Sequence, residues 1–269
     1  MHRRLIIRPG AIGDFILSLP AMEHLKDDYS EVWATSPNLP LARFAHSTRS
    51  IASTGLDMLE FSPDSRLFAE LRNFNSIVSW YGTNRPEFRA AVEGLPFEFL
   101  QAVPPDDCRV HAADFFAAQV GLASPAVPRI DCPRHDGGYA VIHPFSGSRK
   151  KCWPLERYQE VANRLAAHMP VQWCAGPEEP LAGAVRIDDL YQLGCWLAAA
   201  RVYIGNDSGI THLAAAVGTP VVALFGPTDP RIWAPCGPDV CVIARPALED
   251  IHVEDVVNAV LRYDSSFTP

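Results

Sequence analysis

The segment from Val202 to Pro230, VYIGNDSGITHLAAAVGTPVVALFGPTDP, limits the possible folds of this chain more than any other. Its pattern predicts a strand, a polar turn, a small-residue helix, a second strand and a loop, over residues 202–204, 205–209, 211–217, 219–225 and 226–230. Strand–helix–strand units build parallel sheets, which bind ligands at the carboxyl ends of their strands. A helix that begins just after a Gly/Ser turn also presents free N–H groups, which suit phosphate. We therefore expect an anion site in this segment.

The rest of the chain repeats the same alternation of short apolar runs and helical patterns. We expect further strands over residues 5–8, 31–35, 76–81, 139–143 and 171–175. We expect helices over residues 15–26, 66–74, 87–94, 112–121, 153–168, 190–200 and 253–263. Pro20 lies inside the first of these helices and should kink it or mark a late start. The alternation predicts an α/β fold with parallel sheets that are covered by helices.

A stretch rich in proline and glycine, residues 126–138, divides this pattern into two similar halves. We expect a first domain over residues 1–125 and a second over residues 139–269, with the stretch between them as a linker. The last helix, 253–263, carries an apolar stripe. Packing of this stripe back on the first domain is one arrangement open to it.

The net charge of −8 argues against nucleic acid as the main partner, because neutralising phosphates needs a basic face. Residues 2–4 and 149–151 are the candidates for a local basic patch. The chain has no run of 18 apolar residues that would span a membrane, and its amino terminus meets Gly and Asp too soon for a secretory signal. Its seven cysteines are scattered without a Cys-x-x-Cys pair, which favours reduced thiols over disulfides or zinc. A cytoplasmic location follows.

Motifs for several common chemistries are missing. The sequence has no G-x-G-x-x-G after its first strand, no P-loop, no Asp-x-Asp pair and no G-x-S-x-G elbow. Instead, three loops each follow a strand and precede a helix, at residues 9–14, 143–154 and 206–212. A cleft between two such domains would gather a carboxylate, several cations and a helix N-terminus. These groups suit transfer from a phosphate-activated donor, because they supply a base for the nucleophile and positive charge for the leaving group.

Three blocks in order resemble glycosyltransferase family 9, the heptosyltransferases of bacterial lipopolysaccharide synthesis. They are AIGDFILSLP at 11–20, His143-Pro144 with Lys-Cys-Trp-Pro at 151–154, and DSGITH at 207–212 with FGPTDP at 225–230. The resemblance implies a GT-B architecture, in which two Rossmann-like parallel-sheet domains face a central cleft. It also implies an inverting transfer of heptose from ADP-heptose to a sugar hydroxyl, with neither a metal nor a cofactor. The implied partners are a nucleotide-sugar and a glycan or glycolipid acceptor. We expect a monomer with at most transient, peripheral contact with the inner membrane.

The resemblance also assigns roles to residues. Asp14 matches the catalytic base, although an Asp before a helix can simply be its N-cap. Lys151 matches the lysine that neutralises the donor pyrophosphate, and its alternative is a solvated surface lysine. Ser208 and Gly209 match the turn whose N–H groups hold phosphate. The remaining matches are Asp207, which is oriented toward the donor, and His212, which binds phosphate or braces the loop.

Glu178 follows the 171–175 strand, where the family places a glutamate that contacts the nucleotide ribose, and Glu179 is equally placed. The donor-binding set is completed by Gly13, Ser146, Gly147 and Ser148. The family often has Ser before its middle-block Lys, whereas here Gly147 stands between Ser146 and Ser148, so a phosphate-binding hydroxyl is shifted or lost.

The first half, which receives the acceptor in the family, is shorter than expected, so the acceptor is expected to be smaller or different. Two alternatives stay open. One is a nucleotide-sugar epimerase or hydrolase on the same architecture, and the other is a non-catalytic nucleotide-sugar-binding protein.

Overall fold

The computed structural model describes residues 1–62, 64–133 and 137–263. The chain forms two compact units, which are described here one at a time. Unit 1 holds Met1–Cys108 and Ala112–Ala126, and unit 2 holds Arg109–His111 and Val127–Pro269. The expected linker at 126–138 includes residues 134–136, which lie outside the described residues.

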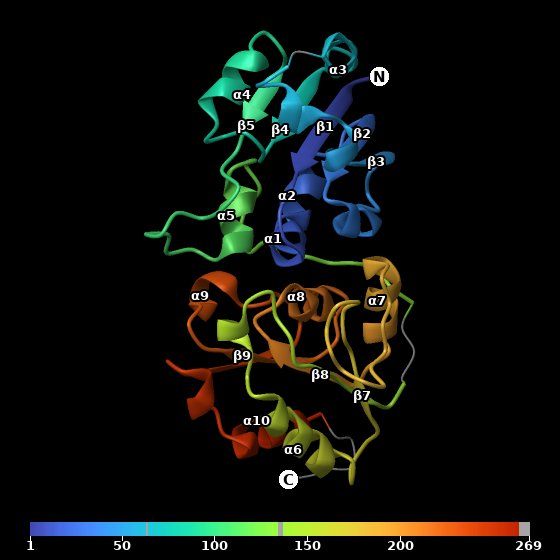
Figure 1. Cartoon of the computed structure of the whole chain (residues 1–269), viewed down its shortest axis with the longest axis vertical. Helices are drawn as coiled ribbons and strands as arrows, with labels where there is room; N and C mark the ends of the chain where they lie inside the picture. The colour runs from blue at the N-terminus through green and yellow to red at the C-terminus, as the bar shows by residue number, and fades with distance from the viewer. Residues whose placement is uncertain (63, 134–136, 264–269) are drawn as a thin grey trace. The chain divides into compact units, whose positions relative to one another are not determined.

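Unit 1 is a five-stranded parallel sheet with the strand order β3-β2-β1-β4-β5 (Figure 1). Its strands are β1 (Arg3–Arg8), β2 (Tyr29–Ala34), β3 (Ser47–Ser50), β4 (Ser76–Ser79) and β5 (Phe97–Phe99). Its helices are α1 (Ile12–Leu17), α2 (Leu19–His24), α3 (Ser65–Leu71), α4 (Pro86–Ala91) and α5 (Ala112–Ala118), with 3₁₀ turns at 36–41, 51–53 and 56–58. The α/β fold with parallel sheets that the sequence predicts is thereby confirmed.

The two faces of the unit 1 sheet follow from the alternation of side chains along its strands. Leu5 and Ile7 of β1 lie in an apolar cluster with residues from α3 and α4. Arg8 lies on the opposite face, where its guanidinium is 4.7 Å from the ring of Phe116 in α5. The break expected near Pro20 is present, because α1 ends at Leu17 and α2 begins at Leu19 with the proline in its first turn.

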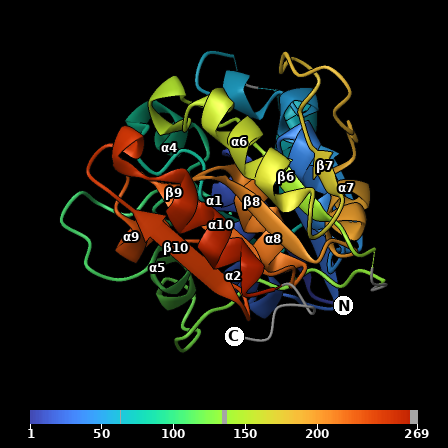
Figure 2. The same ribbon diagram turned by 90° about the horizontal axis from the view of Figure 1, so that it is seen from below.

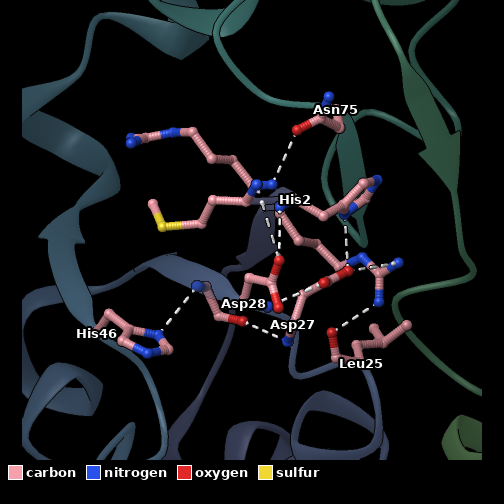
Figure 3. Close-up of polar contacts among 10 residues, drawn as sticks. His2, Leu25, Asp27, Asp28, His46 and Asn75 are labelled. Atoms are coloured by element: carbon pink, nitrogen blue, oxygen red, sulfur yellow. Dashed lines mark hydrogen bonds and ion pairs between the residues drawn. The ribbon is translucent and has the colours of Figure 1, made fainter.

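At the amino ends of its strands, unit 1 pairs two residues of the first basic cluster, residues 2–4, with an acidic side chain (Figure 3). Nδ1 of His2 lies 2.8 Å from Oδ2 of Asp27, and Arg4 makes an ion pair with the same carboxylate at 3.2 Å. The backbone N–H of His2 donates to Asp28 at 2.9 Å. The backbone N–H of Arg3 donates to Oδ1 of Asn75 at 2.8 Å. These contacts tie β1 to the starts of β2 and β4, while the Arg3 guanidinium lies 4.2 Å from the centre of the Tyr29 ring.

Unit 2 is a second five-stranded parallel sheet, with the strand order β10-β9-β8-β6-β7. Its strands are β6 (Ala140–His143), β7 (Val171–Trp173), β8 (Val202–Asn206), β9 (Val221–Phe225) and β10 (Val240–Ala244). Its helices are α6 (Leu155–Leu165), α7 (Leu190–Leu197), α8 (Gly209–Ala216), α9 (Pro230–Trp233) and α10 (Val253–Leu261), with 3₁₀ turns at 149–151 and 248–250.

Helices α6 and α10 lie side by side on one face of the unit 2 sheet (Figure 2). Val161 of α6 and Val256 of α10 are fully buried in a cluster with Ile142, Ile204 and Leu224 from three strands. The apolar stripe of the last helix is therefore part of the core of unit 2.

Three strands of the structure have no counterpart among the expected ones. β3 has the polar sequence STRS, and β5 has only three residues, so neither carries a strand pattern of its own. β10, VCVIA, is apolar but was not expected, and it pairs with β9 at the edge of the sheet. β9 begins at Val221 rather than at 219, because Pro220 has no N–H to donate to a ladder.

Among the described residues, no helix has the length and apolar character needed to cross a membrane.

Candidate functional site

Two neighbouring strands of unit 2 bring the predicted donor loops together. β6 and β8 are parallel partners, with His143 opposite Gly205 at their carboxyl ends. The loop 144–154 and the turn 206–208 therefore leave the sheet side by side. This edge is where open α/β sheets bind ligands.

Lys151 and Asp207 form an ion pair at this edge. The Lys151 Nζ lies 2.7 Å from Oδ2 of Asp207, and the hydroxyl of Ser146 donates to the Asp207 carbonyl at 2.7 Å. The Asp207 side chain is 9% exposed, whereas that of Lys151 is 35% exposed. A buried carboxylate therefore fixes the position of the lysine side chain, while the ammonium still reaches solvent. This arrangement differs from that of a freely solvated surface lysine.

Ser208 caps helix α8 beside this ion pair. It has an extended backbone, and its side chain accepts a hydrogen bond from the N–H of Thr211 at 3.4 Å. The Thr211 hydroxyl is in turn bonded to Ser208 Oγ at 3.0 Å and to the buried Tyr203 hydroxyl at 3.2 Å. The first N–H groups of a helix have no intrahelical acceptor, and Gly209 begins this one. The turn thus combines a dipole end with the Lys151 ammonium.

Asn206 connects the two loops by hydrogen bonds, and the sequence analysis missed it. Its Oδ1 accepts hydrogen bonds from the N–H of Trp153 at 2.9 Å and from the Tyr158 hydroxyl at 3.0 Å. Its Nδ2 donates to the carbonyl of Pro144 at 2.8 Å. The residue is fully buried at the end of an apolar strand. A polar residue in that position was the available signal, because buried amides must be satisfied by specific partners.

His212 lies in the first turns of α8 and is buried. Burial lowers its pKa to about 4, against the opposing effect of Asp207, and His111 and Lys151 lower it further. Its Nδ1 is a buried atom without a hydrogen-bond partner in the described part of the chain. The imidazole is therefore neutral at pH 7. A neutral ring fits bracing of the loop, or a hydrogen bond to phosphate, better than neutralisation of the phosphate charge.

The two glutamates after β7 differ in their surroundings. Glu179 lies 3.0 Å from Nε2 of buried His143 and accepts a hydrogen bond from the N–H of Gly176 at 2.6 Å. Partial burial by itself would raise the pKa of Glu179, but the bonds from His143 and Gly176 lower it overall. Glu178 is exposed. The inward position at this edge belongs to Glu179.

Asp14 lies in unit 1, in the first turn of α1. The N-cap of that helix is Ala11, so the alternative in which Asp14 is the cap is wrong. The carboxylate lies over Gly10, because a Cβ on that glycine would be 3.6 Å from Oδ2 of Asp14. Gly10 has a φ of +122°, a conformation that favours glycine, and its carbonyl accepts a hydrogen bond from buried Asn38 at 3.1 Å.

Arg8 holds the backbone of Asp14 by a hydrogen bond. It is the second residue that the sequence analysis missed. The side chain is 1% exposed, and it donates to Ser18 Oγ at 2.7 Å, to the Ala102 carbonyl at 3.1 Å and to the Asp14 carbonyl at 3.2 Å. Burial lowers the pKa of Arg8 to about 10, and nearby Asp14 opposes the shift. The guanidinium is still protonated at neutral pH. An arginine that ends an apolar strand, LIIR, was the signal available.

The remaining predicted donor residues are dispersed. Gly13 lies inside α1 of unit 1. Gly147 and Ser148 are exposed, and the Ser148 carbonyl accepts the N–H of Lys151 at 2.9 Å. A side chain at Gly147 would meet nothing within 4 Å. Of the two serines in this loop, Ser146 is the one that contacts the ion pair.

The sequence profile of glycosyltransferase family 9 (heptosyltransferase) matches residues 111–259, which is more than half of the chain. The chain belongs to this family. It is 32% identical over 117 residues to lipopolysaccharide heptosyltransferase 3 of Escherichia coli, a match that covers 36% of this chain and 34% of that protein. It is 34% identical over 103 residues to lipopolysaccharide heptosyltransferase 2 of E. coli K12, covering 37% and 25%. The chain thus spans about a third or less of the length of these curated relatives.

Solved heptosyltransferases share the fold over nearly the whole chain. The structure of E. coli ADP-heptose LPS heptosyltransferase II aligns with a TM-score of 0.75 at 18% identity, covering 97% of this chain and 98% of that one. An E. coli heptosyltransferase solved with ADP aligns with a TM-score of 0.69 at 17% identity, covering 97% and 99%. The fold is therefore that of the GT-B heptosyltransferases, with two Rossmann-like parallel-sheet domains.

The family match covers the predicted donor-binding residues of unit 2 and leaves out the predicted base. Lys151, Asp207, Ser208 and His212 all lie inside residues 111–259, whereas Asp14 lies before them. The described residues include no group of three or more His, Cys, Asp and Glu that could hold a metal ion. The roles of the individual residues remain predictions, and they are taken up next.

Proposed function

We propose that this family 9 member transfers heptose from ADP-heptose to a hydroxyl of a lipopolysaccharide-type glycan, by inversion and without a metal. The observation that carries the proposal is the cluster of Lys151, Asp207 and Ser208 at the start of α8. An ammonium aimed by a carboxylate and a helix N-terminus at one sheet edge suit a diphosphate. Solved relatives hold ADP and ADP-2-deoxy-2-fluoro heptose, which supports an ADP-linked donor.

The proposed reaction uses groups from both units. The Asp14 carboxylate accepts the proton of the acceptor hydroxyl as that oxygen bonds to the anomeric carbon of the donor sugar. The bond between this carbon and the phosphate oxygen breaks on the opposite face, and ADP leaves with the electron pair. Lys151 and the N–H groups that begin α8 would stabilise the charge that ADP gains.

The test is to measure ADP release from ADP-heptose with and without a glycan acceptor, for the wild type and for Asp14→Asn. Acceptor-dependent release is expected, and the variant should lose about 100- to 10,000-fold in turnover, as general bases contribute. Binding of ADP, measured by calorimetry, should be unchanged in the variant, because the predicted nucleotide site lies in unit 2.

Acceptor-independent consumption of the donor would instead indicate a hydrolase or epimerase. Binding of UDP or GDP in preference to ADP would overturn the heptose assignment. Turnover that survives Asp14→Asn would remove the base from the proposal.

A further inference from the structure

A buried asparagine of unit 1 contacts the turn that leads to the predicted base. Asn38 lies in the 3₁₀ turn 36–41, which follows β2, and it is fully buried. Its Nδ2 donates to the carbonyl of Gly10 at 3.1 Å. β1 and β2 are parallel neighbours whose last residues, Arg8 and Ala34, lie opposite each other. The turn after β1 and the turn after β2 therefore meet at one edge of the sheet.

The orientation of the Asn38 amide is fixed by its partner. A carbonyl oxygen only accepts hydrogen bonds, so the amide must present its NH₂ group to Gly10. Oδ1 of Asn38 is buried and has no hydrogen-bond partner in the described part of the chain. The bond to Gly10 is thus the one that this side chain makes among the described residues. What the amide supplies here, beyond its bulk, is a donor to the Gly10 carbonyl.

Gly10 connects this bond to the carboxylate of Asp14. A Cβ on Gly10 would lie 3.6 Å from Oδ2 and 3.7 Å from Cβ of Asp14, so the carboxylate lies directly over the glycine. Ala11, the N-cap of α1, follows Gly10 in the chain. A shift of the Gly10 peptide would therefore move both the surface that the carboxylate faces and the start of the helix that carries it.

The 3₁₀ turn that carries Asn38 is a rigid support. Pro37 and Pro40 restrict its backbone, because the proline ring fixes φ. The hydroxyls of Ser36 and Ser50 are hydrogen-bonded at 2.8 Å, which joins the turn to the end of β3. Leu41, at its end, is buried. The amide is therefore presented to Gly10 from a fixed segment.

Two separate contacts thus hold the chain around the predicted base. Arg8 donates to the carbonyl of Asp14 itself, and Asn38 donates to the carbonyl of Gly10, before the helix begins. The hydroxyl of Thr35 lies 3.4 Å from the Gly10 carbonyl and adds a second, longer donor. Such contacts matter for a general base, because a misplacement of about 1 Å can cost about 100-fold in rate.

We infer that Asn38 is a positioning residue for Asp14: its amide fixes the Gly10 turn and thereby the place of the carboxylate. The inference rests on the proposed function for the role of Asp14 as base. Asn38 is fully buried in unit 1, whereas the predicted nucleotide site lies in unit 2. Loss of the amide should therefore slow the chemical step and leave binding of the donor unchanged.

The experiment is steady-state kinetics on the whole chain, with ADP-heptose as donor and O-deacylated bacterial lipopolysaccharide as acceptor. In Asn38→Ala, kcat should fall about 10- to 100-fold, while KM for ADP-heptose and Kd for ADP stay within about twofold of the wild type. Asn75→Ala is the matched control. Asn75 is bonded to the other end of β1, where its Oδ1 accepts the N–H of Arg3 at 2.8 Å. Equal falls of kcat in both variants would overturn the inference.

A double-mutant cycle tests whether Asn38 acts through the carboxylate. In the Asp14→Asn background, Asn38→Ala should lower the remaining turnover by less than about twofold, because no base is left to position. An equal fold-loss in both backgrounds would overturn the inference. Thr35→Val removes the second donor to Gly10 with little change in volume, and it should lower kcat about 2- to 3-fold. If Asn38→Ala does not fold, this variant takes its place, and an unchanged kcat would then overturn the inference.

Hydrogen exchange separates this inference from the proposed function. The N–H of Phe15 donates to the carbonyl of Ala11 at 3.0 Å, so its exchange reports on the first turn of α1. It should exchange at least about 10-fold faster in Asn38→Ala and at the wild-type rate in Asn75→Ala, whether or not the chain turns over donor. An unchanged rate in Asn38→Ala would show that the amide does not fix this turn. Full turnover in Asp14→Asn would count against the base alone.

Discussion

The Nη2 of Arg8 donates to the main-chain carbonyl of Asp14 at 3.2 Å, so a fully buried cation holds the backbone of the predicted base. Its other N–H groups donate to Ser18 and Ala102. This guanidinium joins the first turn of α1, the break between α1 and α2 and the loop after β5. The position of Asp14 is thus set by contacts from three parts of unit 1.

Arg8→Met should therefore destabilise unit 1. The substitution leaves Ser18 Oγ and the Ala102 carbonyl without the Arg8 donor, at about 1–3 kcal/mol for each group that water cannot reach, and it removes one of the three donors to the Asp14 carbonyl. We expect the free energy of unfolding to fall by about 3 kcal/mol or more in urea denaturation. ADP affinity should stay within about twofold of the wild type. A loss of less than about 1 kcal/mol would mean that the guanidinium is not a structural brace.

The sequence predicts the layers of this fold because buried parallel strands are short apolar runs. Such runs can be recognised without knowing which strands they pair with. The runs 5–8, 139–143 and 202–204 all fall within strands of the structure or overlap them. β3 and β5 form because neighbouring strands offer them unpaired backbone groups. Their own sequences, four polar residues in β3 and three residues rich in aromatics in β5, do not indicate this pairing. The sequence analysis also passed over β10, whose apolar run is longer.

The site was predictable in type but not in its contacts. Lys151 and Asp207 stood out as charged residues in loops after strands, yet their ion pair joins positions 56 residues apart. The bond from Arg8 to Ala102 spans 94 residues. The choice between Glu178 and Glu179 depends on which side chain turns toward His143, and adjacent positions in a loop carry no periodicity to decide it.

Lys151→Met should weaken ADP binding. The change removes the ammonium and leaves the Asp207 carboxylate, which is buried in the same edge, to repel the diphosphate. Charge-assisted hydrogen bonds contribute about 1.5–3 kcal/mol, so the Kd for ADP should rise about 10- to 150-fold in isothermal titration calorimetry. Stability should fall as well, because the substitution leaves the largely buried Asp207 carboxylate without its cation, and urea unfolding of the same variant measures that loss separately from ADP binding.

Lys150→Met is the matched control for this variant. Lys150 is an exposed neighbour in the same 3₁₀ turn, and its loss changes the net charge equally. If both variants weakened ADP binding to the same extent, the effect would be one of net charge, and Lys151 would have no particular role.

His212 should make unit 2 less stable in acid. Burial keeps the pKa of His212 at about 4 in the folded chain, against an ordinary value of 6.5. Between these values the unfolded chain takes up a proton that the folded chain does not. The contribution is complete above about pH 6.5, and it is lost as the pH falls toward 4. Its size is roughly 3 kcal/mol.

The comparison that isolates this group is wild type against His212→Gln, unfolded in urea at pH 7 and at pH 4.5. Other groups titrate in both proteins and cancel in the difference. The wild type should lose about 2–3 kcal/mol more than the variant between the two pH values. An equal loss in both proteins would show that His212 is not held neutral by burial.

Glu178→Gln and Glu179→Gln should separate two carboxylates that the sequence cannot tell apart. Glu179 accepts from His143 and from Gly176, and the His143 bond reaches the carboxyl end of β6, where the donor loop begins. A neutral amide at 179 keeps the shape but loses the charge in both hydrogen bonds, and its NH₂ can face the Gly176 N–H. We expect Glu179→Gln to weaken ADP binding about 5- to 20-fold, since hydrogen bonds to charged groups are worth about 1.5–3 kcal/mol and the amide retains part of this.

Glu178→Gln, on an exposed side chain, should change ADP binding by less than about twofold. Calorimetric titration of both variants with ADP decides the matter: a larger effect at 178 would place the ribose contact there and leave Glu179 as a partner of His143 alone.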